Sequence, residues 1–389
     1  MKRLYLTFII VLAILAFAGY IFWHYFYLAT VTIDPIPTDA TITINGQAIA
    51  DRTVHLSQGT YTVTVGESGY RTQNFSVKVG VGSQVNKAIT LQALPKPTKL
   101  IDGAINSLVT SADQNNLYFE QNNILYRYSI GNGSLGPAVP LTPQLANIAS
   151  VDWSPDFSLA LLHKTNGEVG LYDFNRYDLL HQTYTPLAAG IRATAWDSDN
   201  SGFYYEFQPD TGEHSLIKVN KAGKNPERLG TLDNFHFAGI DFVPGDETSL
   251  FLANTDRKSQ GDVIKFDTHQ KVILPITTSG NAYGPVISPD KSHVAYLDNG
   301  ELVVAQSDGT NKRNLTLRPK ANNYVFMNNA TIAVMLPNQI SVVSVTDGSH
   351  KDYAITAPSD AIDGLVSDST GTDLYYVYNN ALYQIKYNQ

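Results

Sequence analysis

Short apolar segments alternate with polar turns over the last three-quarters of the chain, and the same pattern occurs seven times. In each copy an apolar strand leads into a polar turn, and two more apolar strands follow. The polar turns read Ser111-Ala112-Asp113, Ser154-Pro155-Asp156, Asp197-Ser198-Asp199, Pro244-Gly245-Asp246, Ser288-Pro289-Asp290, Asn328-Asn329 and Ser367-Asp368-Ser369. The copies lie roughly 40–45 residues apart, which is typical of a four-stranded repeat. A unit of this size buries its apolar face only against neighbouring units, so the pattern predicts a repeat architecture.

The number of strands predicts how the repeats are completed. Outer fourth strands are predicted between repeats at Leu179-Leu180-His181, Val272-Ile273-Leu274 and Leu315-Thr316-Leu317. The seventh repeat has no room for a fourth strand before Gln389, whereas Thr98-Lys99-Leu100-Ile101 precedes the first repeat and has no repeat of its own. We therefore predict a seven-bladed β-propeller over residues 98–389, closed by this N-terminal strand.

Residues 30–93 show a period-two alternation that is typical of half-buried strands, as in Thr41-Ile42-Thr43-Ile44. Asn45-Gly46 indicates a tight turn between two strands. We predict a small β-sandwich over 30–93. Residues 94–97, Leu94-Pro95-Lys96-Pro97, are predicted to be a stiff linker, because paired prolines favour extended backbone and cannot enter a sheet interior.

The N-terminus carries a long apolar segment within residues 1–29. Lys2 and Arg3 are followed by Leu4 to Trp23 without a charged side chain, and roughly 20 such residues span a bilayer as a helix. We predict a single-pass transmembrane helix with a cytoplasmic N-terminus and the rest of the chain outside the cytoplasm. The alternative is a cleaved signal peptide, since Ala16-Phe17-Ala18 resembles a cleavage site. The predicted fold is therefore all-β, with one N-terminal transmembrane helix.

The amino-acid composition narrows the classes of partner and cofactor that the protein can bind. The formal net charge is −8 and no basic stripe follows residue 3, which disfavours nucleic acid because phosphate binding needs a positive field. The absence of cysteine excludes disulfides, thiolate chemistry and cysteine-based zinc sites. No oligomeric state is indicated.

One turn resembles the start of a calcium loop. Asp197, Asp199 and Ser201 place oxygen atoms at alternating positions before Gly202. The twelfth position of the loop is Gln208 rather than a bidentate acid. The same segment lies where every other repeat has a polar turn, so we favour a turn over a calcium site, and we predict no other cofactor.

No catalytic motif is present, and we predict no catalytic residues. The nine histidines share no metal-binding spacing: His24, His55, His163, His181, His214, His236, His269, His293 and His350. The sequence also lacks a phosphate-cradling Gly-Lys loop and a Gly-x-Ser-x-Gly nucleophile elbow.

Two resemblances follow from these segments. Pro37-Thr38-Asp39-Ala40, Gln58-Gly59-Thr60-Tyr61 and Ser68-Gly69-Tyr70 make residues 30–93 similar to the PEGA domain, which implies a surface-associated spacer or adhesive module without catalysis. Trp153-Ser154-Pro155-Asp156 and Ile287-Ser288-Pro289-Asp290 resemble the turns of WD-like propellers of the bacterial TolB type, which implies a fold but no activity.

The sequence as a whole favours a membrane-anchored binding or scaffold protein of the bacterial cell envelope that recognises a protein, glycan or wall polymer. One alternative is an envelope hydrolase or lyase with its site in a propeller channel. Another is a sensor or spacer subunit of an envelope complex.

Overall fold

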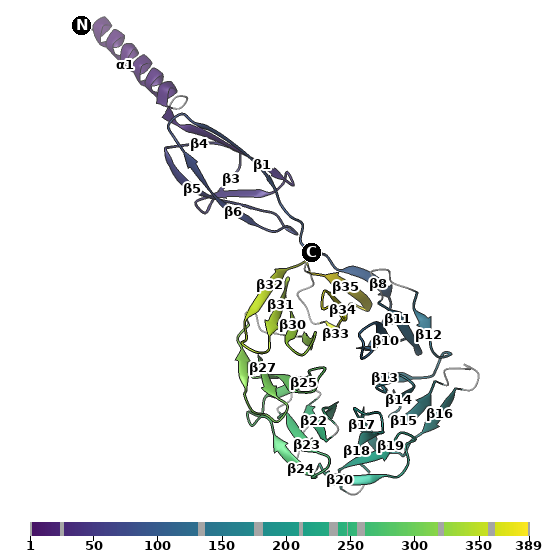
Figure 1. Cartoon of the computed structure of the whole chain (residues 1–389). Helices are drawn as coiled ribbons and strands as arrows, with labels where there is room; N and C mark the ends of the chain where they lie inside the picture. The colour runs from purple at the N-terminus through teal and green to yellow at the C-terminus, as the bar shows by residue number, and fades with distance from the viewer. Residues whose placement is uncertain are drawn as a thin grey trace. The chain divides into compact units, whose positions relative to one another are not determined.

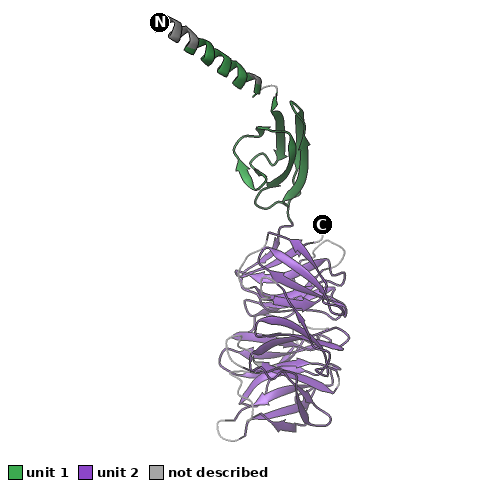
Figure 2. Cartoon of the chain, turned by 90° about the vertical axis from the view of Figure 1, so that its left-hand side faces the viewer, with its two compact units in different colours: residues 1–94 green, residues 95–389 purple. Residues whose placement is uncertain are grey.

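The computed structural model describes residues 2–23, 27–130, 137–174, 182–209, 213–232, 240–246, 248–254, 261–317, 323–356 and 362–387. The chain forms two compact units, Met1–Leu94 (unit 1) and Pro95–Gln389 (unit 2) (Figure 2).

Unit 1 contains one helix and two β-sheets (Figure 1). Helix α1 covers Lys2–Phe22. The sheets have the strand orders β4-β1-β7 and β3-β2-β5-β6. The strands are β1 Ala29–Ile36, β2 Thr41–Ile44, β3 Gln47–Ile49, β4 Thr53–Leu56, β5 Gly59–Gly66, β6 Gln73–Val79 and β7 Gln84–Thr90.

One apolar core lies between these two sheets. Val31 and Ile33 of β1 pack in the same buried cluster as Val63 and Val65 of β5. Alternate residues of β1 are buried, as the period-two pattern predicts. The predicted tight turn between β2 and β3 is confirmed, since both Asn45 and Gly46 have positive φ, at 48° and 82°.

Unit 2 is built from repeats of four antiparallel strands that follow one another along the chain. The first three repeats consist of β9 Asn106–Thr110, β10 Asn116–Gln121, β11 Ile124–Ser129, β12 Val139–Pro140, β13 Ile148–Trp153, β14 Leu159–Lys164, β15 Val169–Asp173, β16 Thr183–Pro186, β17 Ile191–Trp196, β18 Gly202–Phe207, β19 Ser215–Asn220 and β20 Glu227–Thr231. The next two consist of β21 Ile240–Pro244, β22 Ser249–Asn254, β23 Ile264–Asp267, β24 Val272–Pro275, β25 Ala282–Ile287, β26 His293–Asp298, β27 Glu301–Gln306 and β28 Arg313–Leu315. The last two consist of β29 Asn323–Phe326, β30 Thr331–Leu336, β31 Gln339–Ser344, β32 His350–Ala354, β33 Asp363–Ser367, β34 Asp373–Tyr378, β35 Ala381–Lys386 and, from the start of the unit, β8 Thr98–Asp102.

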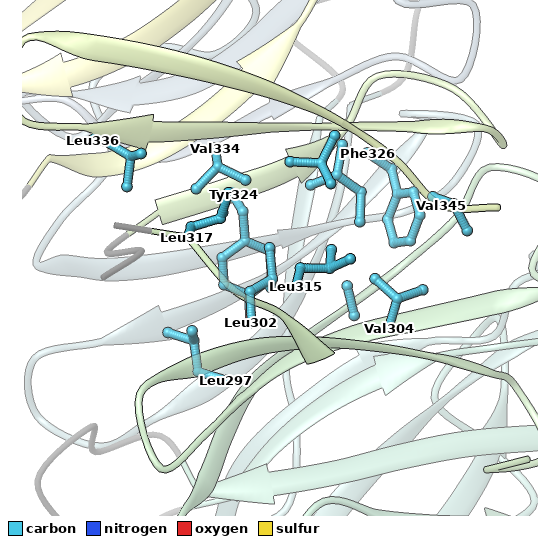
Figure 3. Close-up of a cluster of buried hydrophobic side chains, with 13 residues drawn as sticks. Leu297, Leu302, Val304, Leu315, Leu317, Tyr324, Phe326, Val334, Leu336 and Val345 are labelled. Carbon is cyan, nitrogen blue, oxygen red and sulfur yellow. The ribbon is translucent and has the colours of Figure 1, made fainter. Parts of the chain in front are cut away.

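Neighbouring repeats pack through buried side chains. In Figure 1 the first strands, such as β13, β17 and β25, lie toward the middle of unit 2, and fourth strands such as β16, β20 and β24 lie at its rim. Figure 3 shows Leu302 and Val304 of one repeat against Tyr324, Phe326 and Val334 of the next. The core of unit 2 is therefore divided among the spaces between its sheets.

The prediction of a closed seven-bladed propeller is wrong. Among the described residues, hydrogen bonding gives separate four-stranded sheets and one eight-stranded sheet formed by β21–β28, and none of them closes. The eight-stranded sheet arises because Asn254 of β22 pairs with Tyr283 of β25 in parallel. Most strand pairing lies within single repeats, and repeats meet mainly through side chains, so the strand pattern does not specify a closed ladder.

The predicted pairing of the N-terminal strand is confirmed. Strand β8 pairs antiparallel with β35, with Ile101 opposite Leu382 and Ala381 opposite Asp102. It is the fourth strand of the sheet β33-β34-β35-β8. Of the other predicted fourth strands, Val272-Ile273-Leu274 lies in β24, and only Leu315 of the third lies in β28. Leu179-Leu180-His181 falls outside the described residues.

The prediction of a transmembrane helix is also wrong. Across the described residues, no helix combines the length and the apolar character that crossing a membrane requires.

Candidate binding pocket in unit 2

A pocket of about 460 Å³ lies where the first strands of four consecutive repeats end. It is lined by Val109, Thr110, Ala112, Val151, Asp152, Trp153, Ser154, Pro155, Phe157, Thr194, Ala195, Trp196, Ser198, Phe242 and Pro244. These residues come from β9, β13, β17 and β21 and from the polar turns that follow them. We call it the Asp152 pocket.

The polar turns form this end of each repeat through local hydrogen bonds. In the second repeat Ser154 Oγ donates to Asp156 Oδ1 over 2.8 Å and accepts from the Leu159 N–H over 3.0 Å. The Asp156 carboxylate also accepts from the Ser158 N–H. Ser and Asp are favoured in such turns because their short side chains replace backbone hydrogen bonds. The sequence pattern at these positions therefore follows from turn geometry.

Asp152 departs from the repeat pattern. In every repeat a backbone N–H donates across the first turn, which defines equivalent positions. The donors are Ser111, Ser154, Asp197, Gly245, Ser288, Met327 and Asp368. The residues two positions before them are Val109, Asp152, Ala195, Val243, Val286, Val325 and Val366. A carboxylate thus stands where six repeats carry a valine or an alanine. Residues that break a local rule of the fold are expected at functional sites.

Asp152 belongs to a hydrogen-bond network that joins two repeats. His163 Nε2, on β14, lies 3.1 Å from Asp152 Oδ2 and 2.7 Å from Thr194 Oγ1 on β17. The Thr194 hydroxyl also donates to Asp152 Oδ2. Among the described residues every hydrogen bond to the Asp152 carboxylate uses Oδ2, so Oδ1 stays available to a ligand. The Asp152 side chain is 35% exposed and lines the pocket.

Four aromatic side chains line the pocket: Trp153, Phe157, Trp196 and Phe242. The indole N–H of Trp153 donates to the Ser107 carbonyl over 3.2 Å, and that of Trp196 donates to the Asp152 carbonyl over 2.9 Å. Each indole therefore ties its strand to the first strand of the preceding repeat. Phe157, in the turn after β13, stacks on Tyr118 with ring centres 3.8 Å apart. Both tryptophan donors are directed into the protein, so neither indole N–H is available to a ligand.

The calcium candidate residues form a turn and an ion pair. The buried Asp197 carboxylate contacts Lys218 Nζ at 2.5 Å and accepts from the Tyr204 hydroxyl at 3.2 Å. Asp199 Oδ1 accepts from the Ser201 N–H at 2.8 Å, and the Ser201 hydroxyl donates to Asp197 at 3.3 Å. In the part of the chain that the structure describes, no three His, Asp or Glu side chains gather as a metal site requires. Lys218 supplies the positive charge beside Asp197.

Two histidines lie beside acids that precede them in the chain by 11 and 8 residues. His163 contacts Asp152, and His214 Nε2 lies 2.5 Å from Glu206 Oε1. His24, His181 and His236 fall outside the described residues. The sequence analysis missed Asp152, His163 and Thr194 as a group. The available signal was the single acid among seven equivalent positions, which becomes visible only when the repeats are aligned on their first turns.

Comparisons with known proteins identify one domain and one similar fold. Residues 28–94 are a PEGA domain. No curated protein matches the chain. A solved structure titled "Structure of U3-55K" is 13% identical, with a TM-score of 0.54, and the match covers 75% of this chain and 99% of that chain. At this identity the likeness shows the fold alone. The comparisons show no TolB-type family for unit 2.

Proposed function

We propose that the protein is a binding protein of the cell envelope that acts outside the cytoplasm and holds its ligand in the Asp152 pocket. The PEGA domain at residues 28–94 supports an extracytoplasmic envelope role in general terms. The proposed ligand is a protein, glycan or wall polymer of the envelope. Loops that converge on a rigid scaffold commonly carry such binding sites.

One observation carries this proposal: a concave site with aromatic walls contains a single carboxylate at a position that is apolar in the other repeats. Ligand pockets combine a largely apolar lining with a few polar groups that fix orientation. The Asp152 pocket has this composition. The hydrolase or lyase alternative calls for several acids beside a histidine, whereas the described pocket brings one carboxylate to one histidine.

Blocking the pocket mouth tests the proposal. Ala112 lines the pocket and is exposed, so Ala112→Trp adds a ring at the mouth without entering the core. Ala330, an exposed alanine in the β29–β30 turn, is the matched control. Full-length proteins would be immobilised and incubated with a solubilised envelope fraction. We expect wild type and Ala330→Trp to retain the same material and Ala112→Trp to lose it.

Treating the envelope fraction with protease or with glycosidases beforehand separates a protein ligand from a glycan. Equal retention by all three proteins would refute the proposed use of the pocket. Equal melting temperatures of the two tryptophan variants would show that the comparison is between folded proteins.

A further inference from the structure

We propose that the group bound in the Asp152 pocket is a positively charged lysine or arginine side chain of a polypeptide partner. This inference rests on the proposed binding function and adds the chemistry of the ligand to it. Three properties of the pocket carry it: its charge, its hydrogen-bonding groups and its rim.

The described lining of the pocket holds one ionisable group, the Asp152 carboxylate. Two nearby lysines are each engaged by another acid: Lys221 Nζ, in the β19–β20 turn, lies 3.0 Å from Asp156 Oδ2, and Lys218 Nζ, on β19, lies 2.5 Å from Asp197 Oδ2. Among the described residues, the Asp152 carboxylate is therefore hydrogen-bonded to the His163 ring and the Thr194 hydroxyl, both through Oδ2. A partly buried carboxylate is stabilised by an opposite charge, which a basic ligand would supply.

The wall groups accept hydrogen bonds more than they donate them. The indole donors of Trp153 and Trp196 are used by backbone carbonyls. The hydroxyls of Thr194 and Ser154 donate to Asp152 and Asp156. The lining then offers a carboxylate oxygen, the hydroxyls of Thr110 and Ser198, which can accept as well as donate, and the surfaces of aromatic rings. Ring faces attract cations through their quadrupole, so this wall complements an ammonium or guanidinium donor.

The size and rim of the pocket fit a side chain that arrives on a polypeptide. A volume of about 460 Å³ accommodates the long aliphatic stem of lysine or arginine as well as its charged head. The rim also carries Asp113, beside Ala112, whereas the neighbouring Asp156 is paired with Lys221. A basic segment would meet Asp113 as its anchor residue enters. The net charge of −8 also favours encounter with a basic partner.

Tryptophan fluorescence offers a direct readout, because two of the three tryptophans of the chain, Trp153 and Trp196, line the pocket. Full-length protein carrying Trp23→Phe would be titrated at constant ionic strength. The probes are Nα-acetyl-lysine amide, Nα-acetyl-arginine amide, their neutral isostere Nα-acetyl-norleucine amide, and butylammonium. We expect saturable changes with one or both basic amino-acid amides, and binding at least about tenfold weaker for the norleucine derivative and for butylammonium.

Asp152→Asn is the decisive variant. It keeps the side-chain size, and the equivalent position is uncharged in six repeats, so the fold tolerates the loss of charge there. We expect basic probes to bind at least about tenfold more weakly. Asp308→Asn, in the exposed β27–β28 turn, removes the same charge away from the pocket and should leave binding unchanged.

Each alternative outcome has a distinct meaning. Equal binding of the norleucine and lysine derivatives, unaffected by Asp152→Asn, would overturn the cationic ligand while leaving the pocket a binding site. Butylammonium binding as tightly as the lysine amide would overturn the polypeptide source. No response to any probe also overturns this inference, and the retention experiment with Ala112→Trp then decides separately whether the proposed function fails with it.

Discussion

Single residues in unit 2 differ in how many of their polar side-chain atoms make hydrogen bonds. In Asp152, a residue that lines the pocket, Oδ2 takes the hydrogen bonds of the carboxylate, and Oδ1 has no hydrogen-bond partner among the described residues. Tyr375 and Tyr376 show a second contrast, on adjacent positions of β34. Both side chains are fully buried. Gln384 Nε2 donates to the Tyr375 hydroxyl over 3.2 Å, whereas the Tyr376 hydroxyl has no hydrogen-bond partner among the described residues.

This contrast predicts opposite effects for the same substitution. Tyr376→Phe removes a buried hydroxyl that has lost water without gaining a partner, so we expect the free energy of unfolding to rise by about 1 kcal/mol. Tyr375→Phe removes a partner of Gln384, so we expect it to fall by about 1 kcal/mol. Urea denaturation of both variants measures the difference. Destabilisation of similar size in both would mean that the Tyr376 hydroxyl has a partner in solution.

At the level of elements, the outer fourth strands of the sheets differ in whether their side chains pack against a core. In β8 the side chains of Leu100 and Ile101 pack against the cluster that contains Leu117 and Leu382. In β24 the side chains of Ile273 and Leu274 are 37% and 44% exposed. The two strands occupy the same outer place in their sheets and contain the same two residue types, yet only β8 contributes to a core.

We therefore expect matched serine substitutions to act differently. Leu100→Ser with Ile101→Ser should lower the free energy of unfolding of unit 2 by roughly 3 kcal/mol, because apolar area packed on the core is lost. Ile273→Ser with Leu274→Ser should change it by less than about 1 kcal/mol, because those side chains already contact water. Thermal unfolding followed by circular dichroism compares them. A larger loss in β24 would contradict the packing seen for β8.

At the scale of the whole molecule, aspartates in the turns of unit 2 link its stability to pH. The Ser111 hydroxyl and the Asn115 backbone lower the pKa of Asp113 below its usual value. Hydrogen bonds from Ser344 and Ser349 lower the pKa of Asp347 to about 2. Asp156, Asp246 and Asp290 also have lowered pKa values, because hydrogen bonds outweigh the burial that would raise them. These acids lie in turns of different repeats.

A lowered pKa in the folded state stabilises the fold above the unfolded pKa, near 4, and this stabilisation disappears as the pH falls through the folded pKa. We expect unit 2 to lose stability steadily from about pH 4 to about pH 2. Asp113→Asn with Asp347→Asn should be less stable than wild type at pH 7 and closer to it at pH 2, since asparagine does not titrate. Melting temperatures across this range test the expectation. Parallel curves for both proteins would exclude these two aspartates as contributors.

The sequence by itself determined the local features of this protein. Alternating apolar residues and Asn45-Gly46 specify strands and a tight turn, because side-chain direction and positive φ are properties of a few neighbouring residues. The PEGA domain was also predictable from the sequence. So was the pairing of β8 with the last repeat, because that repeat lacked a fourth strand and β8 was the segment without a repeat of its own.

Only the tertiary structure decided which strands share a sheet and which side chains meet. Asp152, His163 and Thr194 come from three strands in two repeats, and no sequence spacing links them. The pairing of β22 with β25 could not be predicted from the sequence either, because this one backbone pair depends on how two repeats pack against each other. The physical reason is common to both: strand and turn formation is local, whereas the pocket and the sheet boundaries depend on contacts between segments that are far apart in the chain.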